Sequence, residues 1–446
     1  MKSLLTTLAI AIAIALPALS NTIAIAAPAP GVQPATDPTA IATSLLDQLD
    51  AGRYAAAHAS FSPDMAKAVD ATQLQTIWKS LPQQFGAFQK RGAASVKQVD
   101  GMNVVDIPLA YAHGQLLARI AIDGNGKIAG FFIKPAPPPP AAVRADLSAR
   151  EVSFAPPGRS ALPGTVLLPK GKGPFPAVVL VHGSGPNDRD ETVGGTRVFR
   201  DLAEGLADRG IASLRYDKRT KVHPDEFKGA FSIDDETTDD AVAAVAFLRT
   251  QPDIDGKRIY VVGHSQGAMM APRIAQEATA QVRGLVLMAA PARHLEDILI
   301  EQNEYMAHLQ GAPDAKTQAQ LEALKKAVAA VKSITAATPA TQHFLLDLPA
   351  SYWLSLQHYD DVAVARTLTQ PLLILQGGRD FQVTAPDWKR WRDAFGHDPR
   401  ASFHTYPALN HLFVAGKGPG SLAEYAAPAH VDPQVIADIA RWISAH

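Results

Sequence analysis

The chain has 446 residues, of which 47% are hydrophobic and 19% charged, and it contains no cysteine. Its formal net charge is −1, from 42 Lys and Arg against 43 Asp and Glu, so charge gives no basis for binding nucleic acid or an anionic membrane surface. The lack of cysteine excludes disulfides, a thiol nucleophile and a cysteine-ligated metal. A chain of this length has room for more than one domain and for a large hydrophobic core.

The N-terminus has the pattern of an export signal. Lys2 precedes an apolar stretch over 4–19, and Ala24-Ile25-Ala26 has the small-x-small form of a signal-peptidase site. The alternatives are a membrane anchor or an N-terminal core helix, but a proline and a polar Ser-Asn-Thr sequence interrupt the stretch. We predict a signal peptide over 1–26, a flexible lead-in over 27–37 and an exported protein, periplasmic or secreted. No later segment has about 20 uninterrupted apolar residues, so no integral membrane span is expected after cleavage.

Residues 38–134 are predicted to form a small α+β domain. Apolar residues recur at helical spacing up to about residue 89, and the period then changes to that of β-strands. Helices followed by an antiparallel meander are typical of such a domain. No nucleophile, metal cluster or phosphate loop is recognisable in it, so we expect a structural or partner-binding role. The expected strands cover 94–99, 104–111, 116–122 and 128–133.

A proline-rich segment over 135–147 is predicted to be a semi-rigid linker. From 148 to 446 strands and helices alternate, which predicts a doubly wound, mainly parallel sheet covered by helices on both faces. A helical insertion interrupts this alternation over about 292–368, and we predict that it forms a cap over the active site. The expected strands are 151–154, 164–168, 177–181, 211–216, 258–262, 282–288, 371–375 and 401–406, and the expected helices are 199–209, 233–249, 295–309, 315–334, 349–357 and 433–445.

The motif Gly263-His264-Ser265-Gln266-Gly267 joins an expected strand to an expected helix. A G-x-S-x-G sequence in that setting is typical of the nucleophile elbow of α/β-hydrolases, in which two glycines permit a sharp turn and the serine hydroxyl stands clear of the sheet. The five-residue pattern also occurs by chance in unrelated chains, but the strand before it and the helix after it favour the elbow. We predict Ser265 as a catalytic nucleophile.

A serine nucleophile needs a base within hydrogen-bonding reach, and the base needs a third group to orient it. In α/β-hydrolases the chain order is serine, acid, histidine. Asp380 follows a core strand and a Gly-Gly pair that can turn a carboxylate sideways, and His411 follows the last core strand in a loop that can reach the elbow. We therefore predict Asp380 as the acid and His411 as the base. The alternatives are Asp387 for the acid and His404, His397 and His430 for the base.

Acyl-transfer chemistry also needs two backbone N–H groups that stabilise the developing negative oxygen. Gln266 follows the nucleophile at a helix N-terminus, where the helix dipole favours an anion. The loop His182-Gly183-Ser184-Gly185-Pro186 follows the strand over 177–181, and its glycines let the backbone approach a substrate. We predict Gln266 and Ser184 as the oxyanion-hole donors, with Gly183 as the next choice. The alternative is a tight turn whose glycines serve its geometry alone.

Other polar segments near these strand ends are expected to be structural. Internal ion pairs are favoured over substrate contacts in 187–191 and 215–219, and His264 is expected to pack within the elbow. No spacing of His, Asp and Glu suggests a metal site, and no cofactor is expected.

Five motifs follow one another in the second part of the chain: HGSGPNDRDET (182–192), RYDKR (215–219), GHSQG (263–267), QGGRDFQV (376–383) and LNHLF (409–413). In this order and spacing they resemble the EstD-type carboxylesterases, an α/β-hydrolase group near the prolyl-oligopeptidase and dienelactone-hydrolase branches. The resemblance covers about 150–446, and some members of that group carry a similar small N-terminal domain. It implies a triad of Ser265, Asp380 and His411 and hydrolysis of short-chain esters.

The sequence thus predicts an α/β-hydrolase fold with a helical cap, preceded by a small α+β domain, and a carboxylesterase that acts on small-molecule esters through an acyl-enzyme intermediate. A serine peptidase, an amidase or an acyltransferase would use the same triad, because the difference lies in the cap and pocket. A non-catalytic binding protein with a vestigial site is the alternative from another class. A haloalkane dehalogenase is disfavoured, since its chemistry needs an aspartate in place of Ser265. No feature of the sequence indicates a particular oligomeric state.

Overall fold

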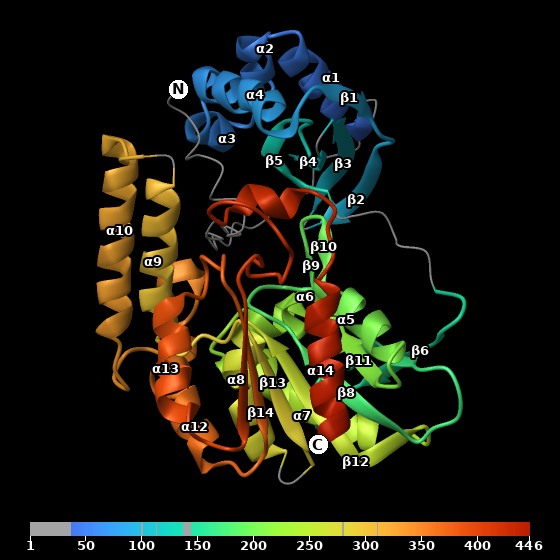
Figure 1. The fold of residues 1–446 in the computed structure, drawn as a ribbon. Coiled ribbons are helices and arrows are strands. Elements are labelled where there is room, and N and C mark those ends of the chain that lie inside the picture. The colour runs from blue at the N-terminus through green and yellow to red at the C-terminus, as the bar shows by residue number, and fades with distance from the viewer. Residues whose placement is uncertain (1–36, 100, 113, 137–143, 279–280, 310) are drawn as a thin grey trace. The chain divides into compact units, whose positions relative to one another are not determined.

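The computed structural model describes residues 37–99, 101–112, 114–136, 144–278, 281–309 and 311–446 (Figure 1). The predicted signal peptide, the predicted lead-in up to residue 36 and residues 137–143 of the predicted linker lie outside the described residues. The chain divides into two compact units. The N-terminal unit ends at Pro138 and takes in Ala426–Pro428, and the C-terminal unit comprises Pro139–Tyr425 and Ala429–His446.

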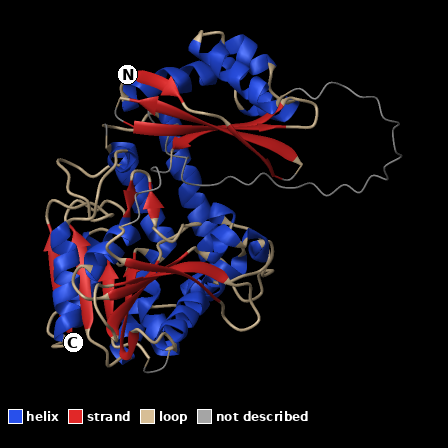
Figure 2. Cartoon of the chain, turned by 90° about the vertical axis from the view of Figure 1, so that its right-hand side faces the viewer, coloured by secondary structure: helices blue, strands red, loops and turns tan. Residues whose placement is uncertain are grey.

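In the N-terminal unit, helices pack against an antiparallel sheet (Figure 2). Strand β3 pairs with β1, β2 and β4, and β4 pairs with β5. The buried residues Leu45, Leu46 and Leu49 of α1 pack in one cluster with apolar side chains of β3 and β4, which agrees with the predicted α+β domain. The elements are α1 (Pro38–Asp50), α2 (Tyr54–Ala59), α3 (Pro63–Ala68), α4 (Ala71–Phe85), β1 (Phe88–Arg91), β2 (Ser95–Val99), β3 (Met102–Tyr111), β4 (Gly114–Ile122) and β5 (Ile128–Pro135).

The helical region of this unit ends earlier than the sequence pattern predicts. Helix α4 ends at Phe85, and Gly86 follows with a φ of 75°, a left-handed conformation that glycine adopts without steric cost. The next residues form β1, whose Phe88 pairs with Tyr111 of β3. The pattern missed β1 because three of its 4 residues are exposed, so it lacks the apolar alternation of a half-buried strand.

The C-terminal unit is built on an eight-stranded sheet in the order β15-β14-β13-β12-β8-β11-β7-β6. The strands from β15 to β11 are parallel, and β7 and β6 continue the sheet antiparallel. The chain leaves β8 for β11 on one side and returns to β12 on the other, so a crevice is expected at the carboxyl ends of β8 and β12. The strands are β6 (Ser148–Phe154), β7 (Leu162–Leu168), β8 (Phe175–Val181), β11 (Ala212–Tyr216), β12 (Ile254–His264), β13 (Gly284–Met288), β14 (Leu372–Gly377) and β15 (Ala401–Tyr406), with a separate hairpin of β9 (Thr192–Val193) and β10 (Thr196–Arg197).

Helices cover both faces of this sheet (Figure 1). Alternate residues of β8 point to opposite faces: Val179 belongs to one buried cluster, and Val178 and Leu180 belong to the other. The first cluster contains side chains of α7, α8 and α13, and the second contains side chains of α5 and α14. This arrangement confirms the predicted α/β fold with a doubly wound sheet. The helices are α5 (Val198–Ala207), α7 (Asp239–Arg249), α8 (Gln266–Glu277), α13 (Ala385–Phe395) and α14 (Pro433–Ala445).

The segment between β13 and β14 is mainly helical. It contains α9 (Leu295–His308), α10 (Ala315–Lys332), the turn η4 (Leu345–Asp347), α11 (Ala350–Gln357) and α12 (Asp361–Thr367). Helix α12 was not expected, because it has only 7 residues and too few turns to show a helical period. The helix expected over 233–249 begins with a π-helical turn, η3 (Asp234–Thr238), before α7. The remaining short helices are α6 (Arg219–Val222), η2 (Pro224–Phe227) and η5 (Leu422–Ala426).

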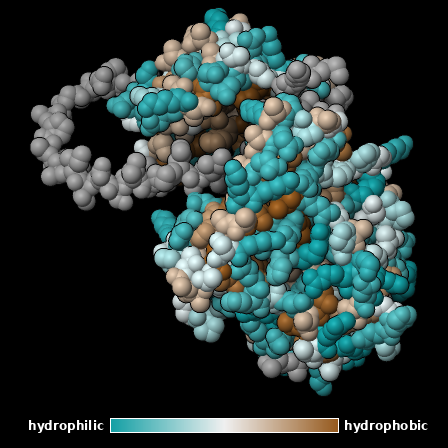
Figure 3. Space-filling model, turned by 90° about the vertical axis from the view of Figure 1, so that its left-hand side faces the viewer, coloured by the Kyte–Doolittle hydropathy of each residue, from teal (hydrophilic) through white to brown (hydrophobic). Residues whose placement is uncertain are grey.

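The side of the C-terminal unit that carries α9 and α10 has a mainly hydrophilic surface with small apolar patches (Figure 3). On α10 the residues Lys316, Gln318 and Glu322 are exposed, whereas Leu321 and Val331 are buried. Helix α10 is therefore amphipathic, with its apolar side facing the protein. In the described part of the chain, none of the helices has the length and apolar character needed to cross a membrane.

Candidate active site

Ser265 lies at the turn between β12 and α8. Its backbone has φ 54° and ψ −119°, a strained conformation for a residue with a side chain. Its N–H donates to Met288 O (2.9 Å), which ties the turn to the end of β13. Ser265 is half-buried while the residues on either side of it are buried, so the turn presents the serine outward.

Both glycines of this turn are sterically required. A Cβ on Gly267 would lie 2.0 Å from Val181 O, and a Cβ on Gly263 would lie 2.3 Å from Gly267 O, whereas real Cβ contacts essentially never fall below 3.0 Å. Helix α8 can therefore start directly against the end of β8. A Cβ on Gly183 would lie 3.3 Å from Ser265 Cβ, so the loop after β8 also passes close to the serine.

Asp380 and His411 lie in the loops that follow β14 and β15. His411 Nδ1 lies 2.8 Å from Asp380 Oδ2, and both side chains are buried. The other carboxylate oxygen, Oδ1, accepts the N–H groups of Gln382 (2.8 Å) and Val383 (3.0 Å). This fixes the carboxylate and orients the imidazole, and it leaves Nε2 of His411 as the ring atom that can take up a proton.

A further hydrogen bond joins the loop of His411 to the turn of Ser265. His264 Nε2 lies 2.9 Å from His411 O, and the centroids of the two imidazole rings are 4.8 Å apart. The loop that carries His411 therefore lies against the turn that carries Ser265, at the carboxyl edge of the sheet. The Ser265 hydroxyl makes no hydrogen bond to any of the described residues, and the bond between nucleophile and base often forms only when substrate is bound.

The alternative acid and bases lie outside this arrangement. Asp387 Oδ2 lies 2.7 Å from Arg293 Nη2, and the pair joins α13 to the start of the helical segment after β13. The three alternatives to His411 are exposed on the surface: His404, His397 and His430.

Gln266 and Ser184 each have a backbone N–H that no other described residue uses. The N–H of Gln266 belongs to the first turn of α8, and the N–H of Ser184 belongs to the loop after β8. Gly183 differs, because its N–H donates to Glu191 Oε1 (2.7 Å). The N–H of Gly183, the next choice for an oxyanion donor, is therefore already used, whereas the N–H of Ser184 has no partner among the described residues.

Glu191 is a buried residue that connects the loop after β8 to the turn of Ser265, although the sequence suggested only an ion-paired surface loop at 187–191. Its Oε2 lies 3.0 Å from His264 Nδ1. Burial disfavours the charged imidazole, but the Glu191 carboxylate outweighs burial and raises the pKa of His264. Burial also disfavours the Glu191 carboxylate, and His264 more than compensates and lowers the pKa of Glu191. His264 and Glu191 therefore form a buried pair, which is an ion pair when His264 is protonated.

His182, at the start of the loop after β8, is buried against the rings of Phe199 and Tyr216. Its Nε2 lies 3.0 Å from Asp188 O and donates to it in the neutral form. Burial lowers the pKa of His182 to about 4, so the ring is uncharged near neutral pH. Within the described residues, no group of three or more His, Asp and Glu side chains is placed to hold a metal ion.

Residues 173–416 match the family described as "Serine aminopeptidase, S33", and residues 42–131 match the family described as "Protein of unknown function (DUF3887)". Esterase EstD of Thermotoga maritima is 37% identical over 380 residues, which cover 83% of this chain and 86% of EstD. The chain belongs to the α/β-hydrolase esterase family. The DUF3887 match lies within the N-terminal unit of this α/β-hydrolase.

Solved esterase structures are also similar to this α/β-hydrolase. The esterase Pf2001 of Pyrococcus furiosus is 17% identical with a TM-score of 0.41, over 63% of this chain and 90% of Pf2001. Est1E of Butyrivibrio proteoclasticus is 15% identical with a TM-score of 0.43, over 66% of this chain and 99% of Est1E.

Sequence reasoning expected internal ion pairs at 215–219, the segment that holds Lys218, but it missed Glu236 and Tyr352 in this α/β-hydrolase. Lys218, Glu236 and Tyr352 form one hydrogen-bonded network with Gln266. Lys218 comes two residues after the buried strand β11, and a charged side chain that is buried there needs a partner. Glu236 and Tyr352 come from distant parts of the sequence and carry no local signal of this kind.

Proposed function

We propose that the chain is an exported serine carboxylesterase that hydrolyses small-molecule esters through Ser265, Asp380 and His411. The observation that supports this most is the hydrogen bond between His411 Nδ1 and Asp380 Oδ2 (2.8 Å), in a loop that His264 ties to the serine turn. An oriented imidazole beside a serine on a strained turn is the arrangement that activates a serine nucleophile. Identity of 37% to Esterase EstD supports a carboxylic ester as the substrate.

In the first half of the reaction, Ser265 Oγ attacks the ester carbonyl carbon while His411 Nε2 takes the hydroxyl proton. Asp380 keeps the proton of the neutral imidazole on Nδ1 and stabilises the imidazolium that forms. The tetrahedral intermediate collapses to an acyl-enzyme when His411 returns the proton to the leaving alcohol oxygen. In the second half, His411 removes a proton from water and the water oxygen attacks the acyl carbon. The second tetrahedral intermediate collapses when His411 returns this proton to Ser265 Oγ, which frees the serine and releases the carboxylic acid.

Two backbone N–H groups stabilise the negative oxygen of both intermediates. The N–H of Gln266 lies in the first turn of α8, where the helix dipole also favours an anion. The N–H of Ser184 supplies the second donor from the loop after β8. Each such donor typically contributes about 10²- to 10³-fold to kcat.

Export and acyl-chain preference complete the proposal. The pattern of residues 1–26 supports removal of a signal peptide after Ala26 and location in the periplasm or outside the cell. Mass spectrometry of the chain from the secreting cell would give an N-terminus at Ala27, and a retained Met1 would contradict export. A preference for short acyl chains is supported by the resemblance to EstD-type carboxylesterases.

A serine peptidase is the second candidate, because the family matched over residues 173–416 is described as a serine aminopeptidase. The same nucleophile, base and oxyanion donors would serve an amide substrate. The two candidates differ in the leaving group, an alcohol in one and an amine in the other, so substrates that differ only in this group separate them.

The test is hydrolysis of p-nitrophenyl esters from acetate to palmitate by the chain without residues 1–26, compared with Ser265→Ala. The matched control is Ser402→Ala, the same change on β15, away from the serine turn. We expect turnover of the short esters by the wild type and by Ser402→Ala, and a loss of at least about 10⁴-fold in kcat for Ser265→Ala.

Activity of Ser265→Ala close to that of the wild type would overturn the proposed nucleophile. Inactivity of the folded wild type on all esters, with hydrolysis of aminoacyl p-nitroanilides, would instead establish the peptidase. Strongest turnover of the palmitate ester would contradict the short-chain preference while leaving the esterase chemistry in place.

A further inference from the structure

Lys218 has a buried side chain that contacts the loop after β8, the loop that carries Ser184. It follows β11, and its side chain is only 2% exposed. Its Nζ lies 2.9 Å from Gly183 O, 3.1 Å from Gln266 Oε1 and 2.7 Å from Glu236 Oε1. The amine therefore has three oxygen partners, one on each of the two segments that carry the oxyanion donors and one on η3.

The bond to Gly183 O determines where the N–H of Ser184 points. The carbonyl of Gly183 and the N–H of Ser184 belong to the same peptide group, which is planar and trans. In a trans peptide group the C=O and N–H bonds point in opposite directions. A contact that holds the carbonyl towards Lys218 therefore turns the N–H of Ser184 away from it.

Asn187 holds the same carbonyl. Its Nδ2 donates to Gly183 O (3.1 Å), so both lone pairs of that oxygen have a donor. On the other side of Gly183, its N–H donates to Glu191 (2.7 Å). The peptide groups on both sides of Gly183 are thus fixed, while Ser184 itself is exposed.

We propose that Lys218, together with Asn187, is a positioning residue for the oxyanion hole: by holding the carbonyl of Gly183 it aims the N–H of Ser184 at the substrate oxygen. The inference rests on the proposed function, because it concerns the same site. Lys218 does not touch the substrate in this account. It acts through the peptide group and through Gln266, whose side chain it also binds.

The second donor residue is held by the same network. Gln266 Nε2 donates to Tyr352 OH (2.8 Å), and Tyr352 OH donates to Glu236 Oε2 (2.8 Å). Burial and the Glu236 carboxylate raise the pKa of Tyr352 well above its usual value, so the phenol remains a donor. Lys218, Glu236 and Tyr352 therefore fix the Gln266 side chain through both its oxygen and its nitrogen.

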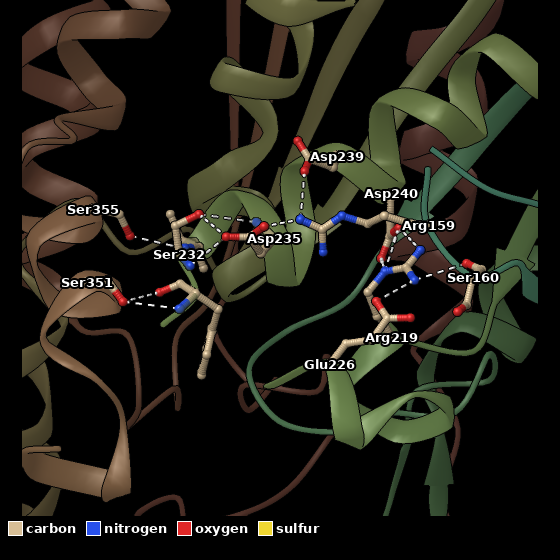
Figure 4. A network of polar contacts seen from close by, with 12 residues as sticks. Arg159, Ser160, Arg219, Glu226, Ser232, Asp235, Asp239, Asp240, Ser351 and Ser355 are labelled. Atoms are coloured by element: carbon tan, nitrogen blue, oxygen red, sulfur yellow. Dashed lines mark hydrogen bonds and ion pairs between the residues drawn. The ribbon is translucent and has the colours of Figure 1, made fainter. Parts of the chain in front are cut away.

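The segment that carries Lys218 is itself firmly anchored (Figure 4). Its neighbour Arg219 is fully buried and pairs with Asp240 (2.6 Å) and Glu226 (3.0 Å). Figure 4 also shows Ser351 and Ser355 of α11 bound to the main chain just before η3. These contacts hold the backbone on both sides of Glu236, so the position of Lys218 Nζ is set by surrounding structure.

The test replaces the ion pair with neutral residues of similar size, Lys218→Met combined with Glu236→Gln, because removal of the lysine alone would leave a buried carboxylate unpaired. The matched control is Arg219→Met combined with Asp240→Asn, which removes a neighbouring buried ion pair that does not contact Gly183. Each variant is melted by circular dichroism and assayed with p-nitrophenyl butyrate and with the thionoester of the same acid. A thiocarbonyl sulfur is a weak hydrogen-bond acceptor, so an intact oxyanion hole strongly favours the oxygen ester.

We expect kcat of the Lys218 variant to fall about 10- to 100-fold with KM changed less than about threefold, since one donor is misdirected but not removed. The ratio of kcat/KM for ester over thionoester should fall about tenfold or more. The Arg219 control should lose thermal stability and keep the wild-type ratio. Asn187→Ala should also lower the ratio of kcat/KM for ester over thionoester. If the Lys218 variant does not fold, Asn187→Ala alone tests the positioning of the Gly183 carbonyl.

An unchanged ester-to-thionoester ratio in the folded Lys218 variant, or in Asn187→Ala if only that variant folds, would overturn the positioning role. Equal falls in the ratio for the Lys218 variant and the Arg219 control would show a general structural effect and would also overturn it. Ser265→Ala separates the two proposals. If Ser265→Ala is inactive while the ratio is unchanged, the esterase proposal stands and only the role of Lys218 fails.

Discussion

Replacing Asp380 with asparagine should reduce kcat by about 10³- to 10⁴-fold without disturbing the fold. The two side chains have the same shape, so the change is confined to hydrogen bonding. Asp380 Oδ1 accepts N–H groups from Gln382 (2.8 Å) and Val383 (3.0 Å). In the variant the amide oxygen must occupy this place, because an NH₂ group there would face two donors. The NH₂ group then faces His411 Nδ1, which lies 2.8 Å from the carboxylate oxygen in the wild type.

This reversal changes the tautomer of His411. The imidazole can accept a hydrogen bond from the NH₂ group only through an unprotonated Nδ1, which places its proton on Nε2. That nitrogen can then no longer take the proton of Ser265. At about 1.4 kcal/mol for each tenfold change in rate, the expected loss is about 4 to 5.5 kcal/mol of transition-state stabilisation. KM should change by less than about threefold, because Asp380 acts through His411.

The assay is kcat and KM on p-nitrophenyl butyrate, with the melting temperature measured by circular dichroism. Asp387→Asn is the matched control, because Asp387 is a second buried aspartate and pairs with Arg293 (2.7 Å) away from the serine. It should melt at a lower temperature and keep kcat within about threefold. Retention of kcat within about tenfold in Asp380→Asn would refute the reasoning, as would a loss of kcat confined to Asp387→Asn.

Three further predictions concern stability. Because the pKa of His182 falls from 6.5 to about 4 on folding, the unfolded chain binds a proton between these pH values that the folded chain does not. The free energy of unfolding should therefore drop by about 3 kcal/mol as the pH falls from 6.5 to 4. Urea titrations of His182→Asn should lack this contribution to the pH dependence. Gly267→Ala places a Cβ 2.0 Å from Val181 O, so it should lower the free energy of unfolding by about 3 kcal/mol. An unchanged melting temperature would contradict this prediction. Burial disfavours the charged forms of Glu191 and His264, but the attraction between them lowers the pKa of Glu191 and raises the pKa of His264. The free energy of unfolding of the wild type should therefore exceed that of the double variant Glu191→Gln/His264→Asn by most between pH 4.5 and 6.5. The difference should shrink at higher pH, where His264 loses its proton, and at lower pH, where Glu191 gains one. A difference that does not change with pH would contradict the ion pair.

The order of the helices and strands could be predicted because each one shows in the spacing of apolar residues within its own short segment. Strand β8 is a run of aliphatic residues buried on both faces, and such a run is visible in the sequence. Strand β1 and helix α12 could not be recognised, since one is mostly exposed and the other is too short for its period to show. The π-helical turn η3 also escaped, because the residues that stabilise it, among them Tyr352, belong to another part of the chain.

The candidate triad could be chosen from the sequence because each member follows a strand that the apolar pattern marks. Parallel strands end at one edge of the sheet, so residues after β12, β14 and β15 must meet there. Glu191 and Lys218 lie within two of the recognised motifs, 182–192 and 215–219, yet their partners are fixed by tertiary structure. Gln266 and Tyr352 are 86 residues apart, and no local pattern predicts their hydrogen bond.

The hydrogen bond from Gln266 to Tyr352 has a consequence for how such enzymes can diversify. Helix α11 belongs to the mainly helical segment between β13 and β14. That segment is not an independent module, because it supplies Tyr352 to the hydrogen-bonded network of Gln266 and Glu236. A chimaera that exchanges the whole segment with that of a relative must also bring a side chain that satisfies Gln266 and Glu236. Recombination between relatives should therefore succeed most often when Gln266, Glu236 and Tyr352 all come from the same parent.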